Sequence, residues 1–202
     1  MNRDEVEALR ALLAPTGWPE RAQAFARALR GSVAGRGGSR AGSRGGLLLV
    51  GTPAEEPWHL AAHLDDEARF SQIQELTPTL VRWAIPAGAP AHLRVGLDRL
   101  AAARRGETLF VVSPEAAPVP LLERADDARR AGATILALNQ GDPELDGLAH
   151  ETLTVAPDAS VPVSFTVAQH LVSTAAGDPA ATRRGLRDRL AHWLEVVSGP
   201  SA

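Results

Sequence analysis

The chain has 202 residues, a formal net charge of −3 and no cysteine, lysine or tyrosine. Its length fits one compact domain with appended helices, and the slightly negative balance gives no general attraction to nucleic acid or anionic lipid. Without cysteine or lysine, the chain has no disulfide, no thiolate metal site, no cysteine nucleophile and no Schiff-base or P-loop lysine chemistry.

Two amphipathic helices are expected at the start of the chain. Residues 4–14 and 19–30 carry apolar residues at helical spacing, and the second helix should end at Gly31. Residues 31–46, GSVAGRGGSRAGSRGG, are too rich in glycine and serine to fold on themselves, so we expect a flexible loop. Its arginines at 36, 40 and 44 resemble an RGG-type tract, but three charges in a net-acidic chain favour a linker over a nucleic-acid site.

From residue 46 onward, short apolar runs alternate with helical patterns. Such continuous apolar strands indicate a parallel sheet that helices cover on both faces. In the second strand, Val81, Trp83 and Ile85 should share one side. We expect strands at 47–51, 79–86, 108–113, 134–139 and 151–157, and helices at 57–70, 91–106, 120–132, 162–176 and 180–197.

This alternation predicts a doubly wound, three-layer αβα sandwich with a five-stranded, mostly parallel sheet and additional N- and C-terminal helices. The expected organisation is helices in residues 1–30 packing on the core, the flexible loop 31–46, and an α/β domain with a C-terminal helix in 47–202. Ligands of such folds bind beyond the carboxyl ends of the strands, so the loops after Val50, Ser113 and Asn139 are the expected site.

The chain begins MNRDEVEALRALLAP, which lacks the basic and apolar regions of a signal peptide. No segment approaches the roughly 20 apolar residues that span a bilayer. We therefore expect a cytoplasmic protein without a membrane partner.

Three stretches resemble the sugar isomerase (SIS) domain family: GGLLLVGTPAEEPWHLAAHL, GETLFVVSPEAAPVPLLERADDARRAGATILALNQ and ELDGLAHETLTVAP. They are similar to the first strand, turn and helix of that family, to its central strand, phosphate loop and following helix, and to its edge strand. The resemblance implies a five-stranded parallel α/β sandwich that binds phosphosugars and associates as a homodimer. The apolar faces of the terminal helices, with Trp193, suit such a dimer.

The phosphate loop of that family normally reads Ser-x-Ser-Gly-x-Thr, where small residues let the backbone donate to a phosphate. Here only Ser113 matches, because Pro114 and Pro118 lack an N–H group and Glu115 adds an anion. The first loop departs as well, since Gly51-Thr52-Pro53-Ala54-Glu55 stands where Gly-x-Gly-x-Ser is usual. The position of a ligand site is therefore expected to remain while its phosphate chemistry is lost. The predicted ligand-binding residues are Gly51, Thr52, Ser113, Glu115, Asn139 and Gln140.

Glu55, Glu56 and Glu115 should converge at the carboxyl edge of the sheet, where clustered carboxylates can exchange protons. The favoured alternative places Glu55 and Glu56 in the first turn of a helix, where acids are stabilised. The resemblance implies proton transfer by a glutamate and a late-helix histidine. Glu55, Glu115 and His170 are thus candidate catalytic residues, although a surface or interface position of His170, with its hydrogen bonds satisfied, is favoured.

His59 and His63 lie four residues apart, the spacing of a two-histidine metal clamp. Leu60 stands where a metalloprotease would have its glutamate, so we favour a packed or surface imidazole pair and predict no metal; a metal site stays the alternative. In ALNQGDPEL, residues 137–145, the polar side chains suit either sugar hydroxyls or an ordinary Asp-Pro turn.

Two functions follow. The first is a SIS-like protein that binds a carbohydrate derivative or serves as a dimeric interaction module, without catalysis and without a cofactor. The alternative is an active sugar-phosphate isomerase that holds phosphate with other residues, for instance the arginines at 36, 40 and 44.

Overall fold

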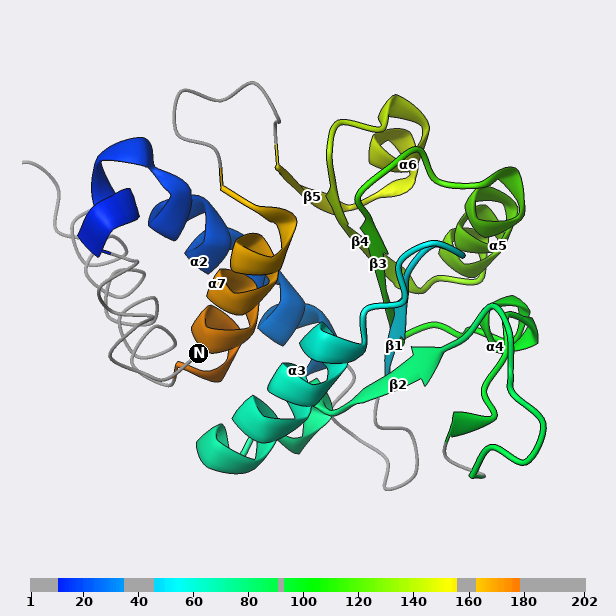
Figure 1. The fold of residues 1–202 in the computed structure, drawn as a ribbon. Coiled ribbons are helices and arrows are strands. Elements are labelled where there is room, and N and C mark those ends of the chain that lie inside the picture. Colours follow the sequence, from blue (N-terminus) through cyan, green and yellow to red (C-terminus); the bar gives the residue numbers. More distant parts are fainter. Residues whose placement is uncertain (1–10, 35–45, 91–92, 156–162, 179–202) are drawn as a thin grey trace, which may run out of the picture.

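The computed structural model describes residues 11–34, 46–90, 93–155 and 163–178. Five parallel strands form one sheet with the order β2-β1-β3-β4-β5. The predicted α/β class and five-stranded parallel sheet are therefore confirmed (Figure 1). The strands are β1 (Leu47–Val50), β2 (Pro78–Val81), β3 (Thr108–Ser113), β4 (Thr134–Asn139) and β5 (Glu151–Thr154).

Helices cover both faces of the sheet, as its continuous apolar strands require. Along β1, Leu47 and Leu49 enter one core, whereas Leu48 and Val50 enter a second core on the opposite face. This alternation gives the three predicted layers. The first core takes side chains from α2 (Trp18–Val33), α3 (Trp58–Ser71) and α7 (Phe165–Gly177), and the second from α4 (Asp98–Ala101), α5 (Val119–Arg130) and α6 (Pro143–Leu148).

The second predicted helix is confirmed as α2, but it extends beyond its expected end. Gly31 was expected to stop the helix, which instead continues to Val33. Val33 is buried in the first core, and this packing outweighs the cost of about 1 kcal/mol for a glycine inside a helix. A short 3-10 helix, η1 (Ala14–Thr16), precedes α2, and Gly17 joins the two with a φ of 69°.

Arg30 joins α2 to the end of α7. Its guanidinium donates hydrogen bonds to the carbonyl oxygens of Ala175 and Ala176, which belong to the last turn of that helix. A cation is stabilised there because the final carbonyls of a helix carry partial negative charge. Arg30 is 8% exposed, so this contact fixes α2 against α7 from within the protein.

The predicted strand 79–86 is wrong in its second half, because β2 ends at Val81. The next two backbone amides do not pair with β1. The amide of Arg82 donates to the carbonyl of Val95 at 2.8 Å, and the amide of Trp83 donates to the Glu56 carboxylate at 3.2 Å. Trp83 still packs on the second core, whereas Ile85 is 42% exposed.

The predicted helix 91–106 is also wrong over most of its length. Its start is diverted because Gly96 forms a parallel bridge with Arg82, which is incompatible with a helix at that point. Only the short α4 remains, and Gly106, with a φ of 88°, turns the chain into β3.

The other predicted elements are confirmed with small changes at their ends. The helix 57–70 is α3, 120–132 is α5 and 162–176 is α7, which begins after the N-cap Ser164. A second 3-10 helix, η2 (Gln74–Leu76), leads into β2. The predicted helix 180–197, most of the helix 4–14 and most of the loop 31–46 lie outside the described residues. Within the described ranges, no helix has the length and apolarity that a membrane span needs.

Candidate functional site

The first predicted ligand loop, which follows β1, is a tight turn that its own hydrogen bonds stabilise. The amide of Thr52 donates to the Glu55 carbonyl at 3.0 Å, and the amide of Glu55 donates to the Thr52 hydroxyl at 3.2 Å. A Cβ atom on Gly51 would lie 2.0 Å from the Glu55 carbonyl oxygen and 2.7 Å from Cδ of Pro57. Glycine is therefore required at position 51 by the chain's own backbone, whether or not a ligand approaches.

The second loop, after β3, is tied to the first by a carboxylate. The Thr52 hydroxyl donates a hydrogen bond of 3.1 Å to Oε1 of Glu115. The Ser113 hydroxyl donates to the Glu115 carbonyl at 2.7 Å, which closes the turn after the strand. Thr52 and Ser113 are buried, so their hydroxyls face the protein's own acceptors.

Asp142, in the turn after β4, also holds the loop that follows β3. Its Oδ2 accepts a hydrogen bond of 2.7 Å from the amide of Ala117, next to the start of α5. Its Oδ1 accepts from the amides of Glu144 and Leu145 at 3.0 and 3.1 Å, which caps α6. A single carboxylate thus anchors the 113–118 loop and begins a helix.

Asn139 and Gln140 have different surroundings at the end of β4. Asn139 is buried, and its side chain accepts from the Gly141 amide and donates to Asp146, each at 2.7 Å. Gln140 is exposed. The hydrogen bonds of Asn139 and Asp142 are those of a turn, which is the second of the two interpretations of residues 137–145.

The three glutamates do not share one set of contacts. Glu56 accepts hydrogen bonds from Arg82, at 3.0 and 3.1 Å, and also from the Trp58 indole and the Trp83 amide. Glu55 is exposed. The expectation that Glu55 and Glu56 lie in a first helical turn is wrong, because α3 begins only at Trp58. Glu56 instead connects the start of α3 to the end of β2, a role that the chain's local pattern did not reveal.

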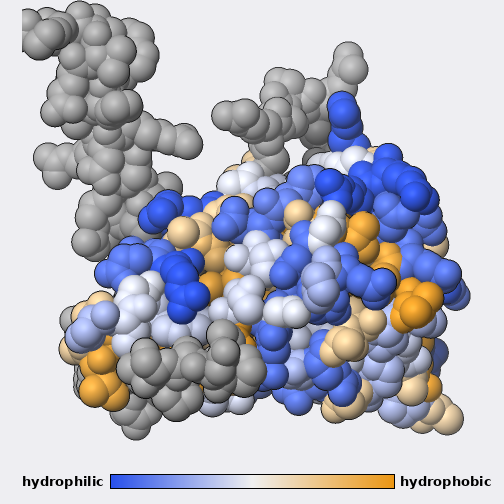
Figure 2. All heavy atoms as spheres, turned by 90° about the horizontal axis from the view of Figure 1, so that it is seen from above, coloured by the Kyte–Doolittle hydropathy of each residue, from blue (hydrophilic) through white to orange (hydrophobic). Residues whose placement is uncertain are grey.

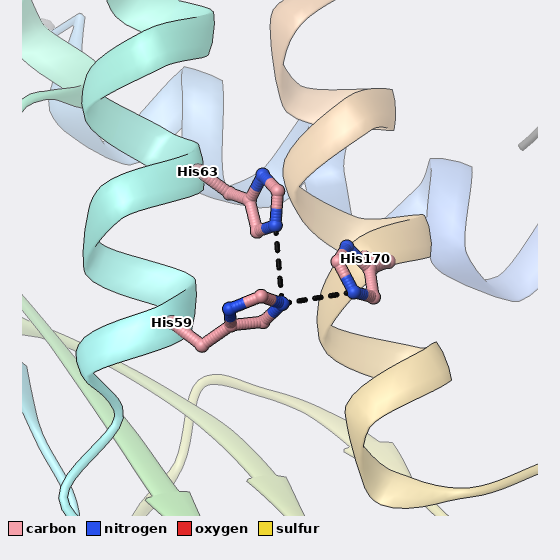
Figure 3. Close-up of side chains that lie close together, drawn as sticks. All are labelled: His59, His63 and His170. Carbon is pink, nitrogen blue, oxygen red and sulfur yellow. Dashed lines mark hydrogen bonds between the residues drawn. The ribbon is translucent and has the colours of Figure 1, made fainter. Parts of the chain in front are cut away.

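Three histidines come together between α3 and α7, which lie side by side (Figure 1). His59 and His63 project from one face of α3, and His170 meets them from α7 (Figure 3). The Nε2 atom of His59 lies 2.9 Å from that of His170 and 3.2 Å from that of His63. His59 is exposed and His63 half-exposed, while His170 is buried. The sequence spacing indicated a pair of His59 and His63 only, and His170 was a separate candidate, so the third member of this cluster was missed.

The surroundings of His63 and His170 favour the uncharged forms of these two rings. Burial, together with the neighbouring His63 and His59, lowers the pKa of His170 to about 4. Burial is also the main cause that lowers the pKa of His63, followed by His59, whereas the nearby Asp66 acts in the opposite direction. At neutral pH the imidazoles of His63 and His170 are therefore uncharged, and each has a nitrogen lone pair.

The surface above the carboxyl ends of the strands is largely polar. Figure 2 views the molecule from this side, and the described hydrophobic residues form separate patches among hydrophilic ones. A surface pocket of about 520 Å³ lies elsewhere, around the far end of α3 and η2. Its lining residues are Asp65, Ala68, Arg69, Gln72, Gln74 and Thr77. None of them belongs to the predicted ligand loops.

The remaining sequence candidates cannot be placed. The arginines at 36, 40 and 44 and Trp193 lie outside the described residues.

No family model and no curated protein matches the chain. Solved structures do match its fold. The sugar isomerase domain of the RpiR transcription factor from Sphaerobacter thermophilus is 15% identical with a TM-score of 0.49, and the match covers 81% of this chain and 84% of that one. The NanR protein of Vibrio vulnificus, in complex with ManNAc-6P, is 15% identical with a TM-score of 0.48, over 96% of this chain and 74% of that one.

Proposed function

We propose that the protein is a non-catalytic SIS-like protein that binds a carbohydrate derivative without using a phosphate group. The proposal depends mainly on one contact, the hydrogen bond between the Thr52 hydroxyl and the Glu115 carboxylate. It places an anion of the chain itself between the two loops in which the family-like motifs would hold a phosphate.

Three donors of these loops support the proposal because they already have acceptors within the protein. Thr52 donates to Glu115, Ser113 donates to a carbonyl, and the Ala117 amide donates to Asp142. Two unit charges 4 Å apart near a protein surface interact by about 4 kcal/mol, so a phosphate beside these carboxylates would be repelled. A neutral sugar hydroxyl, by contrast, can donate to a carboxylate.

The absence of catalysis is part of the same proposal. An aldose–ketose isomerase needs a base within hydrogen-bond reach of the substrate. The side chains proposed for that role have other contacts: Glu115 accepts from Thr52, and the Nε2 atom of His170 lies against that of His59. Glu55, the third candidate, is exposed to solvent.

Calorimetric titration with N-acetylmannosamine and its 6-phosphate tests the proposal, since the second compound is the ligand named for NanR. We expect the phosphate to add no affinity to the wild-type protein. Glu115→Gln should strengthen binding of the 6-phosphate relative to the wild type, because the variant removes one negative charge. Glu123→Gln is the matched control, since Glu123 is exposed on α5 and carries the same charge. Binding of the 6-phosphate at least tenfold tighter than binding of the sugar by the wild type would refute the proposal.

The proposed assembly is a homodimer. Its support comes from the sequence of residues 180–197, where leucines at 186, 190 and 194 and a tryptophan at 193 follow the spacing of an amphipathic helix. Sedimentation equilibrium of the full chain tests it: a dimer mass is expected, and a Leu190→Glu variant should sediment as a monomer. A monomeric wild-type protein would exclude this assembly.

A further inference from the structure

The histidine cluster of α3 and α7 has the dimensions of a metal site. Two ligands with Zn–N bonds of about 2.0–2.1 Å lie about 3.3 Å apart in a tetrahedral site. The two closest Nε2 pairs of the cluster are 2.9 and 3.2 Å apart, and the ligand atoms of all three rings lie within 4.8 Å of one another. Small rotations of the rings are enough to reach the geometry of a bound ion.

Hydrogen bonding alone leaves this arrangement incomplete. The Nε2 atom of a neutral imidazole has either one hydrogen or one lone pair. Nε2 of His59 faces two neighbours, His63 and His170, so it can satisfy only one of them fully. A cation removes the conflict, because each ring then directs its lone pair to the same point.

Two helices hold the rings in place independently of any ion. The spacing of four residues puts His59 and His63 one turn apart on α3, and His170 lies on the neighbouring α7. Leu60 and Leu64 of α3, with Leu171 and Val172 of α7, are fully or almost fully buried in the core beneath. The ligand set is therefore formed by packing, and the metal need not order it.

The burial of the rings leaves one side of the cluster open. His170 is 8% exposed and forms its base, whereas His59 is exposed and His63 is intermediate. In zinc sites with three protein ligands, the fourth position is occupied by water or a substrate oxygen. An ion held here would have that position toward the solvent.

We propose that His59, His63 and His170 bind a divalent ion of the zinc class through their Nε2 atoms, with a fourth position open to water or to an oxygen of a small ligand. Imidazole ligands select zinc and its transition-metal neighbours, whereas Mg²⁺ and Ca²⁺ require oxygen ligands. The site does not depend on the loops after β1 and β3, so it stands whether or not those loops bind phosphate.

Titration of the untagged, chelator-treated full chain with Zn²⁺ tests the proposal by calorimetry. One ion per chain with a dissociation constant below about 1 μM is expected, with no response to Mg²⁺. Co²⁺ should give the intense visible absorption of a four-coordinate ion. Weak binding, or a cobalt spectrum of six-coordinate type, would overturn the assignment.

Single variants show whether all three rings are ligands. His59→Gln, His63→Gln and His170→Gln should each weaken Zn²⁺ binding more than about 100-fold, since even the hydrogen-bond partners of ligands are worth about 10- to 100-fold. His150→Asn is the matched control, because the His150 ring is not part of the cluster and accepts a hydrogen bond from the Ile135 amide. Circular dichroism shows whether each variant folds. If His170→Gln does not fold because its ring is buried, the His59→Gln variant, at an exposed position, still tests the site. Equal affinity of the wild type and His59→Gln, or loss of binding in His150→Asn, would refute the site.

Discussion

The Thr52 hydroxyl donates to the Glu115 carboxylate across 63 residues of sequence, and this bond joins the loops after β1 and β3. Thr52 is fully buried, whereas Glu115 is exposed. Removal of the Thr52 hydroxyl should therefore lower the free energy of unfolding by a different amount than removal of the Glu115 carboxylate.

Thr52→Val is therefore expected to cost more stability than Glu115→Ala. The valine leaves the Glu55 amide without the hydroxyl acceptor and Glu115 without its donor, for a loss of about 1–2 kcal/mol. Removal of the exposed carboxylate should cost less than about 1 kcal/mol, because water replaces it. Urea unfolding of both single variants and the double variant gives the coupling between them. A larger loss for Glu115→Ala would contradict the structure.

Asp142 has two separable roles, which a pair of substitutions distinguishes. Asparagine caps helices as well as aspartate does, so Asp142→Asn should keep the bonds to the Glu144 and Leu145 amides and lose only the acceptor for Ala117. We expect a loss of about 1 kcal/mol for Asp142→Asn and of about 2–3 kcal/mol for Asp142→Ala. Equal losses for the two substitutions in urea unfolding would show that the cap on α6 contributes nothing, and a wild-type stability of Asp142→Asn would show that the Ala117 contact contributes nothing.

Gly51 should tolerate no side chain. An alanine Cβ would lie 2.0 Å from a backbone oxygen of the same turn, so Gly51→Ala is expected to cost at least about 3 kcal/mol, the upper end of overpacking penalties. Gly147→Ala is the matched control, because a Cβ there meets nothing within 4 Å and Gly147 lies inside α6. The control should be neutral or stabilise by up to about 1 kcal/mol. A thermal unfolding midpoint for Gly51→Ala equal to that of the control would be inconsistent with this turn.

These contacts also explain which features the sequence could reveal. The strands at 47–50, 108–113 and 134–139 were predicted because their apolar runs are continuous and carry the signal locally. The end of β2 was not predicted, because it depends on a hydrogen bond from the Trp83 amide to Glu56, which lies in the loop before α3. A bond between distant segments leaves no periodic pattern in either one.

The histidine cluster shows the same limit at the candidate site. The spacing of His59 and His63 is a local signal and was recognised as a possible clamp. The ring that completes it lies 111 positions after His59 and is brought there by the packing of α7 on α3. Similarly, residues 113–118 show in the sequence that the usual glycine and hydroxyls after β3 are missing. The sequence does not show that the Asp142 carboxylate accepts a hydrogen bond from the Ala117 amide.

Acid should destabilise the metal-free protein through the same cluster. The pKa of His170 is lowered from an ordinary 6.5 to about 4, and that of His63 is lowered as well, by burial first and by neighbouring imidazoles second. Between these pH values the unfolded chain binds more protons than the folded protein, so the free energy of unfolding falls as the pH decreases from 6.5 toward 4.

For His170 alone, the loss over this range is at most about 3 kcal/mol. Urea unfolding in the presence of a chelator, at several pH values from 7.5 to 4.5, measures it. His170→Gln removes the ring whose pKa is lowered most, so the slope with pH should flatten. His150→Asn, outside the cluster, should keep the wild-type slope. A slope for His170→Gln as steep as that of the wild type would mean that this ring takes up its proton at the same pH in the folded and the unfolded protein, so that its pKa is not lowered by folding.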